Sequence, residues 1–211
     1  MIRIGIVGSD NSHAIAFSQL ANVERAYGDE VRVVAICGAE AARTQEVAEK
    51  GQIERIVAGP APLTSYSTLR FCPDTVALAE AATGLGALRV GTFSGPCDFG
   101  SQYGGPFFYG THTIEIALRI FGEDAVSATT ASFEGNVAAA VRFGSGALVT
   151  LNLMGNAYYV FHGLVIGKDS YAASALTSKD TYREGLRIFL DMVRTGNRPL
   201  TDEQMLNPIR V

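Results

Sequence analysis

The sequence has 211 residues, of which 47% are hydrophobic and 18% are charged. A chain of this length and composition buries one large core or two smaller ones, so long disordered segments are not expected. The net charge is −4 and no run of basic residues occurs, which gives no electrostatic reason to bind nucleic acid. We therefore expect a small molecule as the partner.

The N-terminus and the cysteines indicate the compartment. No apolar stretch approaches the roughly 18 residues that cross a bilayer, and the chain opens on a strand-like run instead of a basic and then apolar leader. Cys37, Cys72 and Cys97 are odd in number and lack CxxC spacing, which is typical of reduced core thiols and not of a disulfide or zinc framework. We expect a cytoplasmic protein with no metal centre and no membrane partner.

The first part of the chain alternates between strand and helix patterns. Continuous β-branched runs are typical of parallel strands that are buried on both faces. Between the first two runs, Ala16, Leu20 and Val23 form one face of a helix. A strand, a helix and a strand in this order make a right-handed βαβ unit. The pattern predicts strands at 2–7, 31–37 and 53–57, a helix that ends near Gly28, and a second helix at 39–50.

The alternation stops at the next strand candidate, Leu63 to Leu69. Only the segment "AGPAP" separates it from the preceding strand candidate, whereas a parallel crossover needs about a dozen residues. The two strands therefore form an antiparallel or non-adjacent pair, or a piece of the ancestral fold is missing at this junction.

The rest of the chain has the pattern of an antiparallel sheet with helices at its ends. The segment "GPCDFGSQYGGPFFYG" is typical of a functional loop, and "GSG" at 144–146 is typical of a hairpin turn. Consecutive antiparallel strands with terminal helices describe an α+β domain. Helices are predicted at 73–82, 111–121 and 179–194, and strands at 88–94, 126–133, 137–143, 147–154 and 158–166.

Four segments together resemble a known family. They are "IRIGIVGSDNSHAIAF", "LTSYSTLRFCPD", "SGP…GGPFFYGTHTIEIAL" and "YREGLRIFLDMVRTGNRP". In this order, and over most of the chain, they resemble the glucose-fructose oxidoreductase and inositol dehydrogenase (Gfo/Idh/MocA) family. The resemblance implies a Rossmann domain that binds NAD or NADP, and hydride transfer with a sugar, cyclitol or related hydroxy or carbonyl compound. It also implies a second domain whose open sheet commonly makes the contacts of a homo-oligomer.

The sequence departs from the family pattern in its first domain. The family's further strands and helices have no counterpart here, and neither has its Glu-Lys-Pro motif, whose lysine contacts cofactor and substrate. The "EKG" at 49–51 precedes the junction and lacks the proline. We therefore expect an α/β plus α+β chain with an internal deletion: a truncated Rossmann-like domain at 1–83, then an α+β domain with a mainly antiparallel open sheet at 84–211. The deletion removes one wall of the crevice that holds a dinucleotide.

The turn after the first strand carries the cofactor candidates. In the pattern G-x-G-x-x-G, Gly8 matches the first glycine, whereas Asp10 and His13 stand at the second and third. A side chain at the second position crowds the pyrophosphate and a carboxylate repels it, but the amides and dipole of the following helix attract an anion. The alternative is that the polar residues of the turn only cap the helix. The candidates are Gly8, Ser9, Asp10, Asn11, Ser12, His13 and, for the ribose hydroxyls, Glu40, which is alternatively a solvated acid at a helix start.

The catalytic candidate is His112 in "YGTHTIE". The resemblance implies that a histidine at this helix start acts as an acid/base beside an aspartate four residues earlier, but that position is Phe108. Tyr109 offers a hydroxyl instead, and Glu115 lies one helical turn on. An imidazole suits proton transfer near neutral pH, and a histidine bonded only to backbone or solvent is the alternative. The order along the chain also suggests that the substrate is faced by Arg70, Gln102 and Tyr103.

Three functions stay open at this stage. The first is an oxidoreductase that still binds NAD(P) and uses His112. The second is a binding or scaffold protein without redox activity, in which the altered turn is only structural. The third is the product of an internal deletion that folds poorly or only as an oligomer, since an uncovered sheet edge invites pairing.

Overall fold

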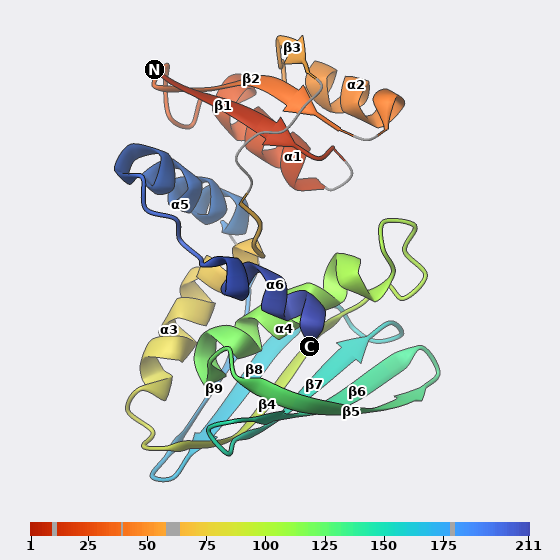
Figure 1. Cartoon of the computed structure of the whole chain (residues 1–211), viewed down its shortest axis with the longest axis vertical. Helices are drawn as coiled ribbons and strands as arrows, with labels where there is room; N and C mark the ends of the chain where they lie inside the picture. The colour runs from red at the N-terminus through yellow and green to blue at the C-terminus, as the bar shows by residue number, and fades with distance from the viewer. Residues whose placement is uncertain (10–11, 39, 58–63, 178–179) are drawn as a thin grey trace. The chain divides into compact units, whose positions relative to one another are not determined.

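The computed structural model of the chain describes residues 1–9, 12–38, 40–57, 64–177 and 180–211. It divides into two compact units, Met1–Thr64 and Ser65–Val211 (Figure 1). The division falls earlier than the expected boundary between residues 83 and 84. The physical reason is that the segment after Thr64 forms a short 3-10 helix and an α-helix, and both pack on elements of the second unit.

The first unit is a truncated Rossmann-like arrangement. Its elements are β1 (Ile2–Val7), α1 (Ser12–Ser18), the π-helical turn η1 (Gln19–Val23), β2 (Val31–Cys37), α2 (Ala41–Lys50) and β3 (Arg55–Ile56). The strands of its described part pair in parallel in the order β1-β2-β3. The predicted strands and the second predicted helix are confirmed, with shifts at their ends, and Ala39 of that predicted helix lies outside the described residues. The first helical segment ends at Val23 and not near Gly28 as predicted.

A buried asparagine holds the first helical segment on this small sheet. The Asn22 amide donates to the carbonyl oxygens of Val33 and Gly51, each at 2.8 Å, and its own oxygen accepts the Val33 backbone N–H at 2.9 Å. One side chain therefore joins η1, β2 and the end of α2. Because all these groups are buried, each of the bonds satisfies a backbone group that would otherwise lack water.

The second unit is an α+β fold around a mixed, mainly antiparallel sheet. Its helices are the 3-10 helix η2 (Thr68–Phe71), α3 (Pro73–Ala82), α4 (Pro106–Phe121), α5 (Thr181–Thr195) and α6 (Asp202–Arg210). Its strands are β4 (Leu88–Pro96), β5 (Ala125–Phe133), β6 (Asn136–Phe143), β7 (Leu148–Met154), β8 (Phe161–Gly167) and β9 (Tyr171–Leu176). They lie in the order β5-β6-β7-β4-β8-β9, and the pairs are antiparallel except for β4 with β7.

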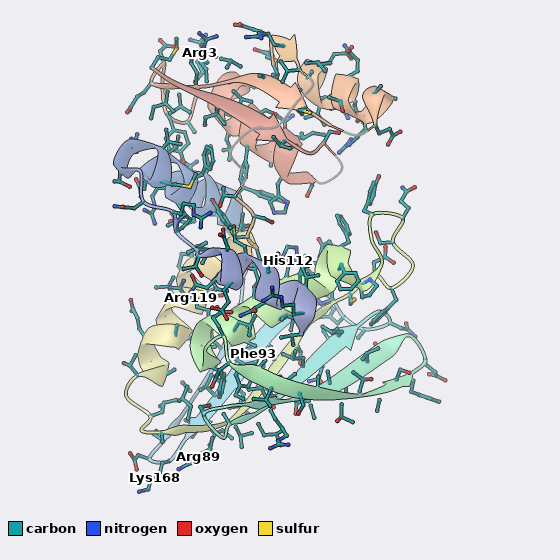
Figure 2. The ribbon with its side chains drawn as sticks, in the orientation of Figure 1. Arg3, Arg89, Phe93, His112, Arg119 and Lys168 are labelled. Carbon is teal, nitrogen blue, oxygen red and sulfur yellow. The ribbon has the colours of Figure 1, made fainter. Side chains whose placement is uncertain are left out.

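The core of the second unit lies between this sheet and its helices. Figure 1 shows α3 and α4 on one face of the sheet, and alternate residues of β4 turn toward them. Among these, the buried Phe93 ring meets Phe121 of α4 at a centroid distance of 6.1 Å (Figure 2). α4 begins at Pro106 and not at Thr111 as predicted, because a proline favours the first helical turn. No helix in the described part of the chain is long and apolar enough to cross a membrane.

The structure corrects two expectations from the sequence. The strand predicted at Leu63 to Leu69 is absent from the described residues 64–69, and Leu63 itself lies outside the described residues. The physical reason is that the Ser67 hydroxyl accepts the Leu69 N–H at 3.2 Å and caps η2, so the chain turns instead of extending. The sequence pattern also misses β9 and α6, although Thr201 and Gln204 form a capping box at the start of α6.

Candidate functional site

The candidate site lies at the N-terminal part of α4, where Figure 2 labels His112. Tyr109 and His112 share one face of this helix, and their rings contact each other at a centroid distance of 5.2 Å. Tyr159 contacts Tyr109 and Phe161 contacts His112, both at 6.3 Å. We call these four residues the His112 cluster. It combines one imidazole, two phenol hydroxyls and an apolar ring.

A glycine on β4 allows the cluster to form. A Cβ added at Gly95 would collide with the Thr113 hydroxyl and would lie 2.8 Å from the Phe161 ring. Because real side chains do not approach this closely, only glycine lets α4 pack so near β4 at this point. The close packing brings Phe161 of β8 within ring contact of His112.

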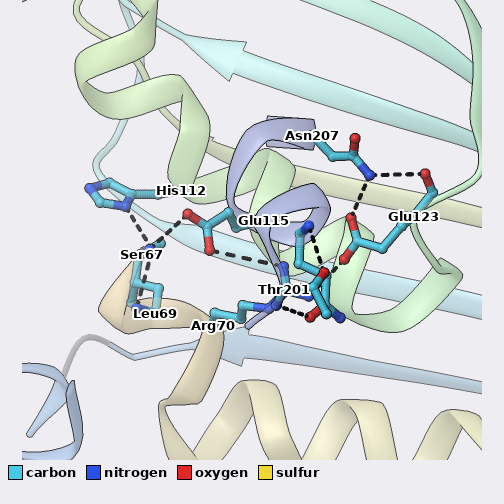
Figure 3. Close-up of polar contacts among 9 residues, drawn as sticks. Ser67, Leu69, Arg70, His112, Glu115, Glu123, Thr201 and Asn207 are labelled. Atoms are coloured by element: carbon cyan, nitrogen blue, oxygen red, sulfur yellow. Dashed lines mark hydrogen bonds and ion pairs between the residues drawn. The ribbon is translucent and has the colours of Figure 1, made fainter. Parts of the chain in front are cut away.

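Ser67 joins His112 to Glu115 on the same helix. The Ser67 hydroxyl lies 2.7 Å from Nδ1 of His112, and the Ser67 backbone N–H donates to Oε1 of Glu115 at 2.7 Å (Figure 3). His112 and Glu115 are one helical turn apart, so both side chains face the same segment. Ser67 is 4% exposed and Glu115 is 7% exposed, whereas His112 is half-buried. The imidazole is therefore held from inside the unit.

A buried arginine continues this network away from His112. Arg70 of η2 is 3% exposed and pairs with Glu123 at 2.8 Å and with Glu115 at 3.9 Å. Asn207 of α6 donates to the carbonyl and to the carboxylate of Glu123, each at 3.1 Å (Figure 3). The expectation that Arg70 faces the substrate is therefore wrong, because two carboxylates neutralise its charge inside the unit.

Glu115 has an altered proton affinity. Burial raises its pKa to about 7, although the Ser67 amide and the Arg70 charge both favour the carboxylate. Within the described part of the chain its Oε2 accepts no hydrogen bond and has Arg70 as its ion-pair partner. Glu115 thus changes charge near neutral pH, next to the residue that contacts His112.

In the first unit, the two described residues of the turn after β1 differ in their surroundings: there is free space around Gly8, whereas Ser9 is buried. Gly8 has φ of +96°, and a Cβ there would meet nothing within 4 Å. Ser9 is fully buried instead: its hydroxyl donates to Thr44 at 2.9 Å, because the Thr44 hydroxyl itself donates to the Glu40 carbonyl at 2.6 Å. A Cβ at Gly38 would collide with both hydroxyls. Ser9 therefore locks the turn onto α2 and does not present its side chain to a ligand.

The other cofactor candidates fall into three groups. Ser12 is exposed at the first residue of α1, and Glu40 is exposed just before α2. His13 is half-buried with its ring on Phe17, and burial lowers its pKa, so its role is mainly in packing. Asp10 and Asn11 lie outside the described residues.

Sequence reasoning missed most of the partners of His112. Tyr159 precedes β8 in a stretch without a motif, and Ser67 stood inside the wrongly predicted strand. Glu123 and Asn207 are distant in sequence, and only the fold brings them to Arg70. The serine in "YSTL" was the one available signal, since serine followed by a turn is a common cap.

The described part of the chain thus combines a Rossmann-like unit with a parallel sheet and a second unit with a mixed sheet. No family model matches the sequence, and no curated protein matches it either. Solved structures do match, and their TM-scores, at identities of 12% to 14%, establish the fold alone.

Three of them illustrate the likeness. A myo-inositol dehydrogenase from Corynebacterium glutamicum is 14% identical with a TM-score of 0.72, and the match covers 99% of this chain and 94% of that one. A scyllo-inositol dehydrogenase from Lactobacillus casei, with NAD(H) and scyllo-inositol bound, is 12% identical with a TM-score of 0.73 over the same shares. A 3-ketoreductase from Actinomadura kijaniata, in complex with NADP, is 13% identical with a TM-score of 0.67, covering 98% and 94%. The chain therefore has the fold of inositol dehydrogenases and related Gfo/Idh/MocA-type oxidoreductases.

The Glu115→Gln variant tests the buried carboxyl. Folding raises the pKa of Glu115 from 4.5 to about 7, so between these values the folded state keeps a proton that the unfolded state has lost. Stability therefore falls as pH rises through this window, by up to about 3 kcal/mol. Urea denaturation at about pH 5 and about pH 8 should show this loss in the wild type and not in the variant.

Glu203→Gln, at an exposed acid of α6, is the control and should not change the pH dependence. A wild-type protein that gains stability relative to Glu115→Gln with rising pH would contradict the burial of an acid with a raised pKa.

Proposed function

We propose that the protein is an NAD(P)-dependent oxidoreductase of the Gfo/Idh/MocA type that acts on a sugar, cyclitol or related small hydroxy or carbonyl compound. The observation that carries the proposal is His112. It lies in the first half of α4 and not at the helix start that the sequence suggested, because the helix already begins at Pro106. Two phenol hydroxyls lie beside it, in a chain with the fold of inositol dehydrogenases. Proton transfer by an imidazole is the half of alcohol oxidation that a protein must supply itself.

The first unit partly fits the cofactor. Gly8, with φ of +96°, suits the tight turn that the first glycine of the fingerprint makes, and the exposed Glu40 after β2 is a candidate for contact with the ribose hydroxyls. NAD or NADP would supply hydride transfer when bound. The residues for its adenosine and phosphate half are therefore Gly8, Ser12 and Glu40, while Ser9 and His13 support the turn from inside.

In the second unit, the residues around His112 have separate roles toward the substrate. His112 moves the hydroxyl proton of the substrate, and Tyr109 orients the reacting oxygen through its own hydroxyl. The Tyr159 hydroxyl lies 3.4 Å from that of Tyr109 and offers a second polar group to the substrate. The apolar ring of Phe161 packs against the imidazole of His112. A ring compound with hydroxyls on its rim and apolar C–H faces suits such a surface.

A binding or scaffold function without redox activity is the second candidate. Two observations favour it: the side chains of Ser9 and His13 are directed into the fold, and the described sheet of the first unit has three strands. A crevice between two half sheets therefore lacks a wall within the described part of the first unit.

We also propose that the chain forms a homo-oligomer through the open face of the second sheet. Four exposed apolar side chains follow one row across neighbouring strands: Leu148 of β7, Val90 of β4, Ile166 of β8 and Tyr171 of β9. Their exposed fractions run from 38% to 69%. A second copy related by a two-fold axis presents the same row and covers it. We further propose that the protein is cytoplasmic, because the free thiols of Cys37, Cys72 and Cys97 stay reduced in that compartment.

His112→Gln tests the catalytic proposal. Glutamine keeps the approximate volume and hydrogen-bonding capacity of the ring but does not titrate, so turnover should fall by a factor of about 10² to 10⁴. We would follow NADH formation spectroscopically with scyllo-inositol, myo-inositol and a panel of sugars, and measure NADH affinity in parallel. The affinity should stay nearly unchanged. His162→Gln, at an exposed histidine of β8, is the matched control, and equal activity of wild type and His112→Gln would refute the role.

Ile166→Lys tests the oligomer. A charge in the middle of the apolar row should shift the sedimentation coefficient from that of an oligomer to that of a monomer. Val126→Lys, at a residue of β5 that is 66% exposed and outside the row, should leave the assembly intact. A wild-type chain that sediments as a monomer, or a variant that stays assembled, would contradict this interface.

A further inference from the structure

We propose that Ser67 sets the tautomer of His112, so that the neutral imidazole carries its proton on Nε2. The consequence for substrate recognition rests on the proposed function, whereas the tautomer follows from the contacts of Ser67 alone. The sequence alone assigns no role to Ser67, and its hydroxyl is the group found at Nδ1 of the candidate acid/base.

Two hydrogen bonds fix Ser67 in addition to its contact with the imidazole. Its backbone N–H donates to Glu115 at 2.7 Å, and its hydroxyl oxygen accepts the Leu69 N–H at 3.2 Å as the cap of η2. With 4% of its surface exposed, the residue has little freedom to rotate or to move toward solvent. The hydroxyl is therefore a fixed partner for Nδ1 of His112, 2.7 Å away (Figure 3).

The direction of the hydrogen bond follows from what each partner can do. Among the described residues, the Ser67 hydroxyl contacts the Leu69 N–H and Nδ1 of His112. The backbone N–H can only donate, so the single hydroxyl proton of Ser67 has Nδ1 as its acceptor. A buried hydroxyl proton without an acceptor is unfavourable. Nδ1 is then unprotonated, and the proton of the neutral ring is on Nε2.

A carboxylate at the same place would have the opposite effect. It can only accept, so it holds a proton on Nδ1 and leaves the lone pair of Nε2 as a base. The position that the family resemblance assigns to this carboxylate is Phe108, and its ring packs on Tyr103 and Tyr109 at 5.3 and 5.5 Å. Because the Ser67 hydroxyl donates to Nδ1, neutral His112 is a hydrogen-bond donor at Nε2.

This tautomer selects the chemical class of ligand. An Nε2–H donates to a carbonyl oxygen, which can only accept. A hydroxyl oxygen can accept the same hydrogen bond, but its own proton must then find another acceptor, and a hydroxyl that must lose its proton needs the Nε2 lone pair. To accept that proton, the ring must first move its own proton to Nδ1, and the Ser67 hydroxyl must then turn from donor to acceptor. The keto form of a cyclitol or sugar should therefore bind more tightly than its alcohol form.

Nitrogen NMR of the full chain tests the tautomer. The protein has three histidines, so ¹⁵N-histidine labelling gives few signals, and His112→Gln assigns the one of interest. At a pH where the ring is neutral, we expect the wild type to show Nε2 protonated and Nδ1 unprotonated. Ser67→Ala should reduce this tautomer ratio several-fold, and Ser67→Thr, which restores a hydroxyl, should recover it.

Thr201→Ala is the matched control, because it removes a helix cap in the same unit and should leave the His112 ratio unchanged. A wild-type spectrum with the proton on Nδ1 would overturn the proposal, even if Ser67→Ala does not fold. A ratio unchanged in folded Ser67→Ala would overturn it as well.

Ligand binding separates this proposal from the proposed function. Calorimetric titration would compare scyllo-inositol with the ketone formed by oxidising one of its hydroxyls. Tighter binding of the ketone in the wild type, reduced in Ser67→Ala, supports both. The expected tautomer without binding of either compound would leave the assignment to Ser67 intact and count against the cyclitol substrate, and equal binding of the two compounds would overturn the selection of the keto form.

Discussion

The second unit depends on the burial of charges between η2 and α4. Arg70 is almost fully enclosed, and its guanidinium is stable there because Glu115 and Glu123 lie on either side. Removing Glu123, the close partner at 2.8 Å, would leave the Arg70 charge uncompensated in a medium of low polarity, which costs far more than a lost surface ion pair. The position of η2 on α4 is thereby strongly specified. Ser67 is the residue just before η2, so the same constraint fixes the hydroxyl that contacts His112.

The chemistry of the chain is divided unequally between its units. In the second unit, three features position His112. Gly95 allows α4 to pack close to β4, the Phe161 ring contacts the imidazole, and the buried Ser67 hydroxyl contacts Nδ1. In the first unit, the turn after β1 is stabilised by Ser9, Thr44 and Gly38, which close together behind it. The space around Gly8 stays free in this arrangement, but the hydroxyls of Ser9 and Thr44 are hydrogen-bonded to each other inside the unit. Substrate handling is therefore better supported by the described residues than cofactor binding.

The periodic part of the fold could be predicted from the sequence. The runs at β1 and β2 and the face of Ala16 and Leu20 are strong local patterns, and the order of four segments was enough to suggest the fold that the solved structures share. The segment around Ser67 could not be assigned, because "LTSYSTL" alternates like a strand and only the Leu69 cap shows that it turns. β9 is rich in alanine, so its pairing with β8 and not its own pattern makes it a strand.

The candidate site divides in the same way. His112 and Tyr109 were recognisable because they lie in a motif, whereas Ser67 and Tyr159 reach them only through folding across large sequence separations. Arg70 was assigned to the substrate from its place along the chain, and its ion pairs lie instead in the interior. A charged residue in a short apolar segment does not reveal from sequence alone whether it faces a ligand or a buried partner.

The proposed activity requires that this chain binds a nicotinamide dinucleotide with a first unit of three described strands. Calorimetric titration of the purified full chain with NADH and with NADPH tests it most directly, with circular dichroism to establish that the protein is folded. We expect saturable binding of one of the two, with a dissociation constant in the micromolar range. The absence of binding heat for both, across a range of temperatures and in a folded protein, would contradict it and would leave the turn after β1 as a scaffold.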